Sequence, residues 1–347
     1  MRISIARAAI AAAVMLAAPA AALAQSLAQG VTQETVTVHG ASLEGNLEGN
    51  SADREVYVYL PPSYSEDTDR RYPVVYMLHG YGIDAAYWDN FMGFPAPLEN
   101  AYAAGAAEMI VVTPSAFTLH GGSMYSTSAT IGDWESFIAG DLVDYVDSHY
   151  RTIPERASRG LAGHSMGGYG ALRIGMKRAG TFGAVYAMSA CCLPPQPAPQ
   201  PGTPGFDQMD ALDEGEPHQA ETLEFAAVQR ATAAAWAPDP QNPPFYFAPP
   251  VVDGEVQEEA VAAWAANAPI TMVHQYVSAL KSLNALGMEV GLQDGLVGGN
   301  ERLHDILTAY GVDHDWETYE GDHTNRIPER FETDLMPFFT EHLAAGE

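Results

Sequence analysis

Short runs of apolar residues alternate along the chain with longer segments in which apolar residues recur every three or four positions. The runs at 72–78 and 109–113 are almost continuously apolar, which is typical of strands buried on both faces. Segment 133–150 places Trp134, Ile138 and Leu142 on one face, which predicts an amphipathic helix. The strands predicted in this way span residues 31–38, 54–60, 72–78, 109–113, 158–163, 182–188, 288–293 and 316–319. The predicted helices span residues 98–107, 133–150, 166–177, 271–286, 300–310 and 327–342.

The alternation of strands with helices indicates βαβ units, and therefore an α/β fold. Because crossovers between parallel strands are right-handed, the helices should cover both faces of a mostly parallel central sheet.

The pattern changes after Cys192. Segment 193–205 is rich in Pro, Gly and Gln, segment 211–236 is acidic and rich in Ala, and segment 237–250 contains six prolines. A helix is predicted again at 255–267, and the regular alternation resumes at residue 271. We therefore expect one domain over residues 25–347, with a Pro-rich and helical insertion at about 191–268. Such insertions often form lids over binding sites, although plain surface decoration is the alternative.

The first 24 residues have the features of an export signal. Arg2 and Arg7 precede an apolar stretch at 8–18, and Ala22-Leu23-Ala24 forms a small-residue cleavage pattern. A membrane anchor is the alternative, but Pro19 and the short apolar core disfavour it. We expect a Sec-type signal peptide over 1–24, and a mature protein that is periplasmic or secreted.

The charge of the chain is strongly negative. Its 347 residues include 44 Asp and Glu against 16 Lys and Arg, a net charge of −28, and removal of residues 1–24 would bring this to −30. Such a surface repels phosphate backbones and anionic lipids, so we expect no nucleic-acid partner and, after signal cleavage, no membrane association. Neutral or cationic substrates are favoured for the same reason.

The only two cysteines, Cys191 and Cys192, are adjacent. This excludes a cross-linked disulfide framework. Two small buried thiols are the simpler interpretation, and a strained disulfide between neighbours is the alternative.

The strongest chemical motif is the pentapeptide 163–167, GHSMG, which matches G-x-S-x-G. A predicted strand precedes it and a predicted helix follows it, as a nucleophile elbow requires. Small residues allow the strand and the helix to approach closely around a strained turn. Ser165 is therefore the candidate nucleophile, and a glycine-rich turn without chemistry is the alternative.

A serine nucleophile needs a general base, and a late loop should supply it in the order Ser, Asp or Glu, His. His323 follows the predicted strand 316–319 and precedes the last helix, which makes it the candidate base. His304 and His314 are rivals, but both fall within or beside predicted regular structure. His79 and His164 adjoin the two predicted site loops and are interpreted as packing residues.

The third member of the site should follow the strand that precedes the histidine loop. Asp294 comes directly after segment 288–293 and 29 residues before His323. Its carboxylate would accept the proton of one ring nitrogen and stabilise the imidazolium. Asp313, Asp315 and Asp322 are alternatives, but the first two lead into the histidine loop itself and the third adjoins the histidine.

A tetrahedral intermediate needs backbone donors for its oxyanion. The N–H of Met166, directly after the nucleophile, is one candidate. The flexible loop after strand 72–78 should supply the second, with Tyr81 favoured and Gly80 or Gly82 as alternatives.

With these residues in place, the chain resembles the putative esterase family of α/β-hydrolases, which includes S-formylglutathione hydrolases (esterase D), feruloyl esterases, enterochelin esterases and mycolyltransferase antigens. The matching segments are VYLPPSY (58–64), YPVVYMLHGYG (72–82), GDWESFIAGDLVDYVDSHYRT (132–152), RGLAGHSMGGYGALRIGMK (159–177) and GDHTNRIPERF (321–331). The resemblance implies an α/β-hydrolase fold and carboxylic-ester hydrolysis by Ser165, Asp294 and His323, with the amides of Tyr81 and Met166 as the oxyanion hole. The insertion is larger than in compact members, and the glutathione-ester enzymes are typically cytoplasmic, so their substrate is not carried over.

The resulting hypothesis is an exported serine esterase that acts on a small-molecule or saccharide ester through an acyl-enzyme. No metal or organic cofactor is expected, since the chain has no H-E-x-x-H motif and its histidines show no ligand spacing. An acyltransferase with the same triad is one alternative, and a non-catalytic binding protein on a hydrolase scaffold is another.

Overall fold

The computed structural model describes residues 30–203, 205–217 and 225–345. The predicted signal peptide therefore lies outside the described residues. No helix within the described ranges has the length and apolar character needed to cross a bilayer.

One eight-stranded sheet forms the centre of the molecule, in the order β1-β2-β4-β3-β7-β8-β11-β12. Its strands are β1 (Thr32–His39), β2 (Asp53–Leu60), β3 (Val74–Leu78), β4 (Ile110–Pro114), β7 (Arg159–His164), β8 (Ala184–Met188), β11 (Ala285–Gly291) and β12 (Asp315–Tyr319). The strands from β4 to β12 are parallel, whereas β1 and β2 form an antiparallel edge. The predicted mostly parallel sheet is confirmed.

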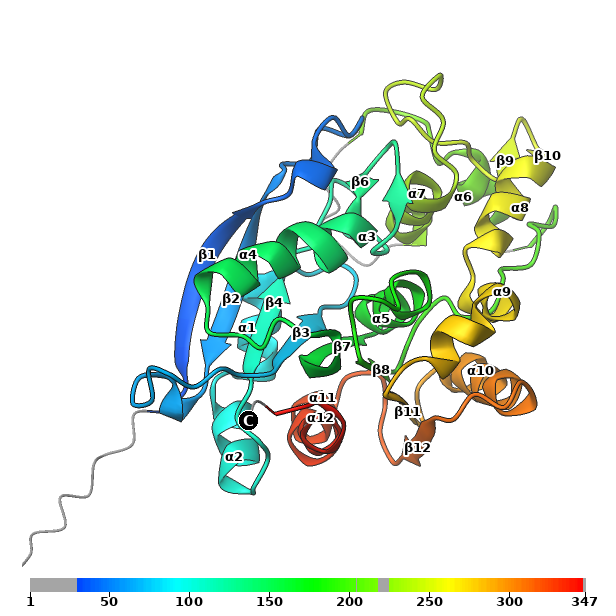
Figure 1. The fold of residues 1–347 in the computed structure, drawn as a ribbon. Coiled ribbons are helices and arrows are strands. Elements are labelled where there is room, and N and C mark those ends of the chain that lie inside the picture. Colours follow the sequence, from blue (N-terminus) through cyan, green and yellow to red (C-terminus); the bar gives the residue numbers. More distant parts are fainter. Residues whose placement is uncertain (1–29, 204, 218–224, 346–347) are drawn as a thin grey trace, which may run out of the picture.

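Helices cover both faces of this sheet, as predicted (Figure 1). One face packs against α1 (Ala85–Met92), α2 (Ala96–Ala103), α11 (Ile327–Arg330) and α12 (Met336–His342). The other face packs against α3 (Trp134–Ser136), α4 (Leu142–His149), α5 (Met166–Lys177), α9 (Pro269–Lys281) and α10 (Val297–Ala309). Successive side chains along each strand point to opposite faces of the sheet. Val75 and Met77 therefore belong to one core, and Tyr76 and Leu78 belong to the other.

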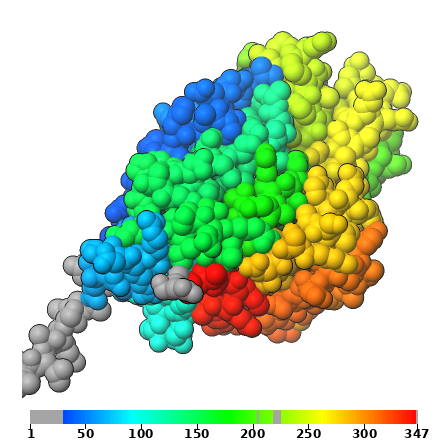
Figure 2. All heavy atoms as spheres, in the orientation of Figure 1, coloured from blue at the N-terminus to red at the C-terminus, as the bar shows by residue number. Residues whose placement is uncertain are grey.

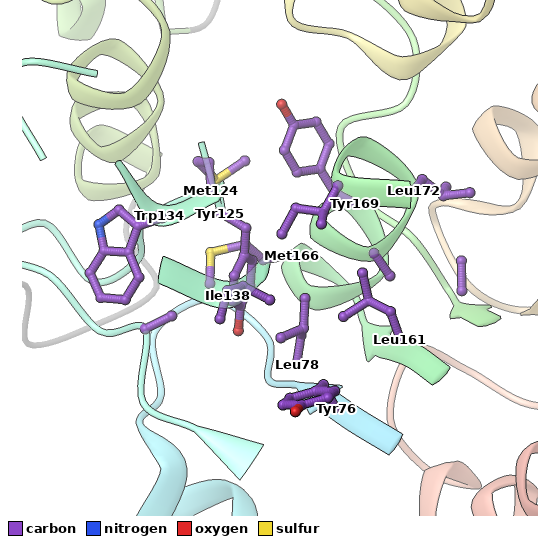
Figure 3. Packing of buried hydrophobic residues seen from close by; sticks show 14 of the residues in the cluster. Tyr76, Leu78, Met124, Tyr125, Trp134, Ile138, Leu161, Met166, Tyr169 and Leu172 are labelled. Carbon is purple, nitrogen blue, oxygen red and sulfur yellow. The ribbon is translucent and has the colours of Figure 1, made fainter. Parts of the chain in front are cut away.

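Helix α5 is anchored on the middle of the sheet. Figure 3 shows Leu78 and Leu161 of the sheet in one buried cluster with Met166, Tyr169 and Leu172 of α5 and with Tyr125. These side chains are almost completely buried. The packing holds the first residue of α5 in place, and that residue directly follows Ser165.

Several predicted boundaries are wrong, each for a local reason. The helix predicted at 98–107 is α2, which ends at Ala103 because the chain turns at Gly105 with a φ of 104°. Helix α1 was missed, although Asp84 caps it by accepting a hydrogen bond from Tyr87 N–H. The helix predicted to reach residue 286 ends at Lys281, and strand β11 already begins at Ala285.

Two helices predicted as regular contain a π-helical turn. Residues Phe137–Asp141 form one between α3 and α4, and Phe331–Leu335 form the other between α11 and α12. A π turn adds one residue to the helical repeat, and a hydrophobic pattern read over few turns does not resolve that addition.

The segment 191–268 leaves β8 and returns at α9. Its elements are α6 (Phe206–Asp210), α7 (Phe225–Trp236), β9 (Val251–Val252), β10 (Glu255–Val256) and α8 (Glu258–Ala266). Together they form the yellow-green and yellow part of the surface at one end of the molecule (Figure 2). The helix predicted at 255–267 starts at Glu258 because residues 255 and 256 pair with β9 instead. A second small hairpin, β5 (Thr127–Ser128) with β6 (Gly132–Asp133), packs against α7.

Candidate active site

Ser165 occupies a sharp turn between β7 and α5. Its backbone has a positive φ of 58° with ψ −114°, outside the regions that residues with a side chain normally adopt, which costs free energy. Glycine is required on both sides of the turn. A Cβ at Gly163 would lie 2.3 Å from the backbone of Gly167, and one at Gly167 would lie 2.0 Å from the carbonyl oxygen of Leu78. The local structure is that of the predicted nucleophile elbow.

The structure brings Ser165, His323 and Asp294 into one chain of hydrogen bonds. His323 Nε2 lies 2.9 Å from Ser165 Oγ, and His323 Nδ1 lies 2.8 Å from Asp294 Oδ2. Asp294 is 4% exposed, and its other oxygen accepts the N–H of Leu296 at 2.9 Å. Because a carboxylate only accepts, Nδ1 carries the ring proton and Nε2 is free to accept the serine proton.

The rival residues lie elsewhere. His304 and His314 pair with each other at 2.8 Å, and the ring of His304 stacks on Trp316. Asp315 approaches His342 at 3.8 Å. None of these side chains contributes to the hydrogen bonds of the serine among the described residues.

Asp322 shapes the loop that presents His323. Its Oδ1 accepts the N–H groups of Thr324 and Asn325, both at 2.9 Å. These backbone bonds lower the pKa of Asp322, so the carboxylate remains charged and keeps the turn closed. Its role is therefore local to the turn, and Asp294 is the carboxylate that reaches the ring.

His164 does more than the packing that the sequence suggested. Its Nε2 lies 2.8 Å from the carbonyl oxygen of His323, so Nε2–H must be the donor. Its ring stacks on Trp88, with centroids 5.9 Å apart and planes inclined by 15°. Burial, and then the nearby His323, lower the pKa of His164 to about 3, so the ring is neutral at ordinary pH. His164 thus holds the backbone of the candidate base without competing for its proton.

His79 holds the loop that carries Tyr81. The N–H of Ala116 donates to His79 Nε2 at 2.8 Å, which leaves Nδ1–H to donate to the carbonyl of Gly80 at 2.8 Å. Burial lowers the pKa of His79 to about 4, so this ring is neutral as well. Tyr125 O–H adds a bond of 3.1 Å to the carbonyl of His79.

The same loop lies directly beside Ser165. A Cβ at Gly80 would lie 3.5 Å from Cβ of Ser165, and the N–H of Gly82 donates to the carbonyl of Gly121 at 2.9 Å. Tyr81 is tied to the next loop by its O–H, which donates to the carbonyl of His120 at 2.7 Å. Within the described part of the chain, the amides of Tyr81 and Met166 donate to no protein acceptor, and Tyr81 lines the cavity at Ser165.

A cavity of about 460 Å³ opens at Ser165. Its wall is mainly aromatic and aliphatic, and the described residues that form it include no Asp, Glu, Lys or Arg. They are Gly80, Tyr81, Ile83, Tyr87, Trp88, Phe91, Met124, His164, Ser165, Cys191, Cys192, Val228, Leu296, His323 and Thr324. Val228 belongs to α7, so the segment 191–268 supplies part of this wall. Such a cavity suits an uncharged, largely apolar group.

No group of three or more His, Cys, Asp or Glu side chains in the described ranges is arranged to hold a metal ion. What the site can do is move a proton from the serine hydroxyl to a histidine and hold the resulting cation beside a buried carboxylate.

Comparison with known proteins gives consistent results. The model of the family described as "Putative esterase" matches residues 50–340. Esterase Rv1288 of Mycobacterium tuberculosis is 34% identical over 139 residues, which is 39% of this chain and 28% of that protein. An endo-1,4-beta-xylanase/feruloyl esterase of Xylanibacter ruminicola is 28% identical over 131 residues, which is 36% of this chain and 18% of that protein. The chain thus matches less than a third of the length of these relatives.

Solved structures show the same fold. A ferulic acid esterase superimposes with a TM-score of 0.64 at 23% identity, covering 91% of this chain and 99% of that one. An S-formylglutathione hydrolase from Staphylococcus aureus superimposes with a TM-score of 0.59 at 17% identity, covering 91% of this chain and 100% of that one. These likenesses confirm the α/β-hydrolase fold.

Proposed function

Since the chain belongs to the putative esterase family, we propose that it hydrolyses carboxylic esters through an acyl-enzyme on Ser165. The observation that carries this proposal is the chain of hydrogen bonds from Ser165 through His323 to Asp294 at an uncharged cavity. A serine hydroxyl is a weak nucleophile alone, and this arrangement supplies the base and the group that orients the base.

In the proposed reaction, His323 Nε2 accepts the proton of Ser165 while Oγ attacks the ester carbonyl. Asp294 stabilises the imidazolium that forms. The amides of Met166 and Tyr81 donate to the oxyanion of the tetrahedral intermediate. The imidazolium then protonates the departing alcohol, and water hydrolyses the acyl-enzyme by the same steps.

The proposed substrate is a neutral ester with an aromatic or apolar group. The cavity wall carries aromatic side chains and no ionised acid, Lys or Arg among its described residues, so a charged group would lose its hydration without gaining a partner. Ferulic acid esterases among the similar structures act, by their names, on a substrate of this general kind. The net charge of −28 further disfavours anionic esters at low salt.

We also propose export through the segment 1–24, which places the enzyme in the periplasm or outside the cell. The N-terminal sequence of the protein recovered from the producing cells tests this. A mature chain that begins near Gln25 supports export, and an uncleaved Met1 contradicts it.

Labelling with a fluorophosphonate tests the nucleophile. The wild-type protein should become labelled and should hydrolyse activated neutral esters, whereas Ser165→Ala should do neither. Ser189→Ala is a matched control, because Ser189 has a positive φ like Ser165 but is buried and does not line the cavity. A wild-type protein that is folded but never labels would identify a binding protein instead, and labelling of Ser165→Ala would exclude Ser165 as the nucleophile.

A further inference from the structure

Two sulfur atoms lie in the wall of the cavity that contains Ser165. Cys191 and Cys192 are both half-buried, and their Sγ atoms are 2.8 Å apart. Both residues line the cavity, and the N–H of Cys191 donates to the carbonyl of Ser165 at 3.1 Å. The pair therefore connects the nucleophile to the start of the segment 191–268.

The backbone brings these two side chains to the same side. Neighbouring side chains in an extended chain point in opposite directions. Here Cys192 has a φ of 58°, a left-handed conformation that a residue with a side chain rarely adopts and that costs free energy. An unfavourable conformation that places two sulfurs together beside an active site points to a use for the pair.

We propose that Cys191 and Cys192 form a reversible redox site, which closes to a disulfide in the wall of the substrate cavity. One thiolate attacks a low-molecular-weight disulfide, which forms a mixed disulfide and releases one thiol. The second cysteine then attacks the sulfur of the first, which forms the Cys191–Cys192 bond and releases the second thiol. Both cysteine thiols are oxidised, and the added disulfide is reduced to two thiols.

Adjacency makes this bond labile rather than structural. Consecutive Cα atoms are 3.80 Å apart across a trans peptide, whereas disulfides usually join Cα atoms 4.4–6.8 Å apart. A disulfide between neighbours therefore departs from the preferred geometry and is easily reduced. The hydrogen bond to Cys192, and then burial, raise the pKa of Cys191 well above its ordinary value, so oxidation should quicken as the pH rises.

The Cys191–Cys192 disulfide would close a small ring of atoms, and this ring should stiffen one side of the cavity. It fixes the first two residues of a segment that also supplies Val228 to the wall. The hydrogen bonds among Ser165, His323 and Asp294 do not involve either sulfur. The redox state should therefore act mainly on the binding of bulky esters, a consequence that rests on the proposed function.

The experiment compares protein treated with oxidised glutathione and protein treated with dithiothreitol. After each treatment, N-ethylmaleimide blocks free thiols, and the intact mass and the kinetics are measured. Since the chain has only two cysteines, an intramolecular disulfide can be only this one. The oxidised chain should take up no maleimide, and the reduced chain should take up two. Compared with the oxidised protein, the reduced protein should have a kcat/KM for a bulky neutral aryl ester that is lower by about threefold or more, mainly because its KM is higher.

The double variant Cys191→Ser/Cys192→Ser is the matched control, and its activity should respond to neither reagent. Two free thiols after oxidation, or glutathione adducts without ring closure, would overturn the proposal. A disulfide that leaves the kinetics of the bulky ester unchanged would overturn its role in the cavity. Fluorophosphonate labelling of the same samples separates the two proposals, because ring closure in a protein that never labels would contradict the esterase and support the redox site.

Discussion

The carboxyl group of Glu48 gives the sharpest test of the electrostatics of this fold. Its side chain is 2% exposed, with Oε2 accepting the side-chain N–H of Asn50 at 2.7 Å and Oε1 3.7 Å from His120 Nε2. Burial raises the pKa of Glu48 from 4.5 to about 7. The cluster lies close to the site, because the carbonyl of His120 accepts the O–H of Tyr81.

The sign and size of the effect follow from this pKa. The folded protein holds the Glu48 proton more tightly than the unfolded chain does, so the stabilisation is complete below about pH 4.5 and is lost as the pH rises through about 7. At 1.36 kcal/mol per pKa unit, the whole change is about 3 kcal/mol. Roughly 2.5 kcal/mol of it falls between pH 5 and pH 8.

Glu48→Gln removes the titration and keeps the shape of the side chain. Urea unfolding at pH 5 and pH 8 gives the free energy of unfolding of each protein. The difference between the variant and the wild type should move in favour of the variant by about 2 to 3 kcal/mol from pH 5 to pH 8. Glu301→Gln, at an exposed position, is the control for the loss of one carboxyl group. If the advantage of Glu48→Gln stays constant or shrinks as the pH rises, His120 must stabilise the ionised carboxylate, and the reasoning from burial is refuted.

The remaining predictions concern the site. Asp294→Asn should lower kcat by about 10³- to 10⁴-fold with a small change in KM, because the amide can stabilise the wrong tautomer of His323; an unchanged kcat in an ester assay would remove Asp294 from the site. His164→Phe, which keeps the stack but loses the donor to the His323 carbonyl, should lower kcat about tenfold, and His164→Gln should restore part of it; equal rates for the two variants would contradict the positioning role. Gly122→Val should lower kcat and cost about 1–3 kcal/mol in urea unfolding, because its Cβ would lie 2.6 Å from Met166 Sδ; a fully stable and active variant would show that the loop yields freely.

Much of the site could be predicted because its signals are local. The G-x-S-x-G turn needs glycine at particular positions, and these glycines can be recognised directly in the sequence. His323 could be selected because hydrophobic periodicity places it on a late loop between a strand and a helix, where the known order of such sites puts the base. The prediction for Asp294 relied on the same order, that for Met166 on its position after Ser165, and that for Tyr81 on the flexible loop after strand 72–78; in the structure Asp294 lies against the ring of His323 and Tyr81 lines the cavity at Ser165.

The roles of His79 and His164 could not be predicted. Each acts through a hydrogen bond to a backbone carbonyl, and the position of a carbonyl cannot be inferred from the pattern of side chains along the sequence. The same holds for Glu48 and His120, which lie 72 residues apart in the chain and meet only because two loops pack together.

By itself, the sequence determined the alternation of strands and helices, the two-sided burial of the central strands, the elbow at Ser165 and the loop position of His323. These features depend on the period of the side chains and on the backbone freedom of glycine, which act over a few neighbouring residues. Only the tertiary structure decided the strand order, the π-helical turns, the meeting of Asp294 with His323, and the position of two sulfurs in the wall of the cavity at Ser165. Those features depend on which segments, distant in the sequence, pack against one another, and this is determined by the close packing of the whole folded chain.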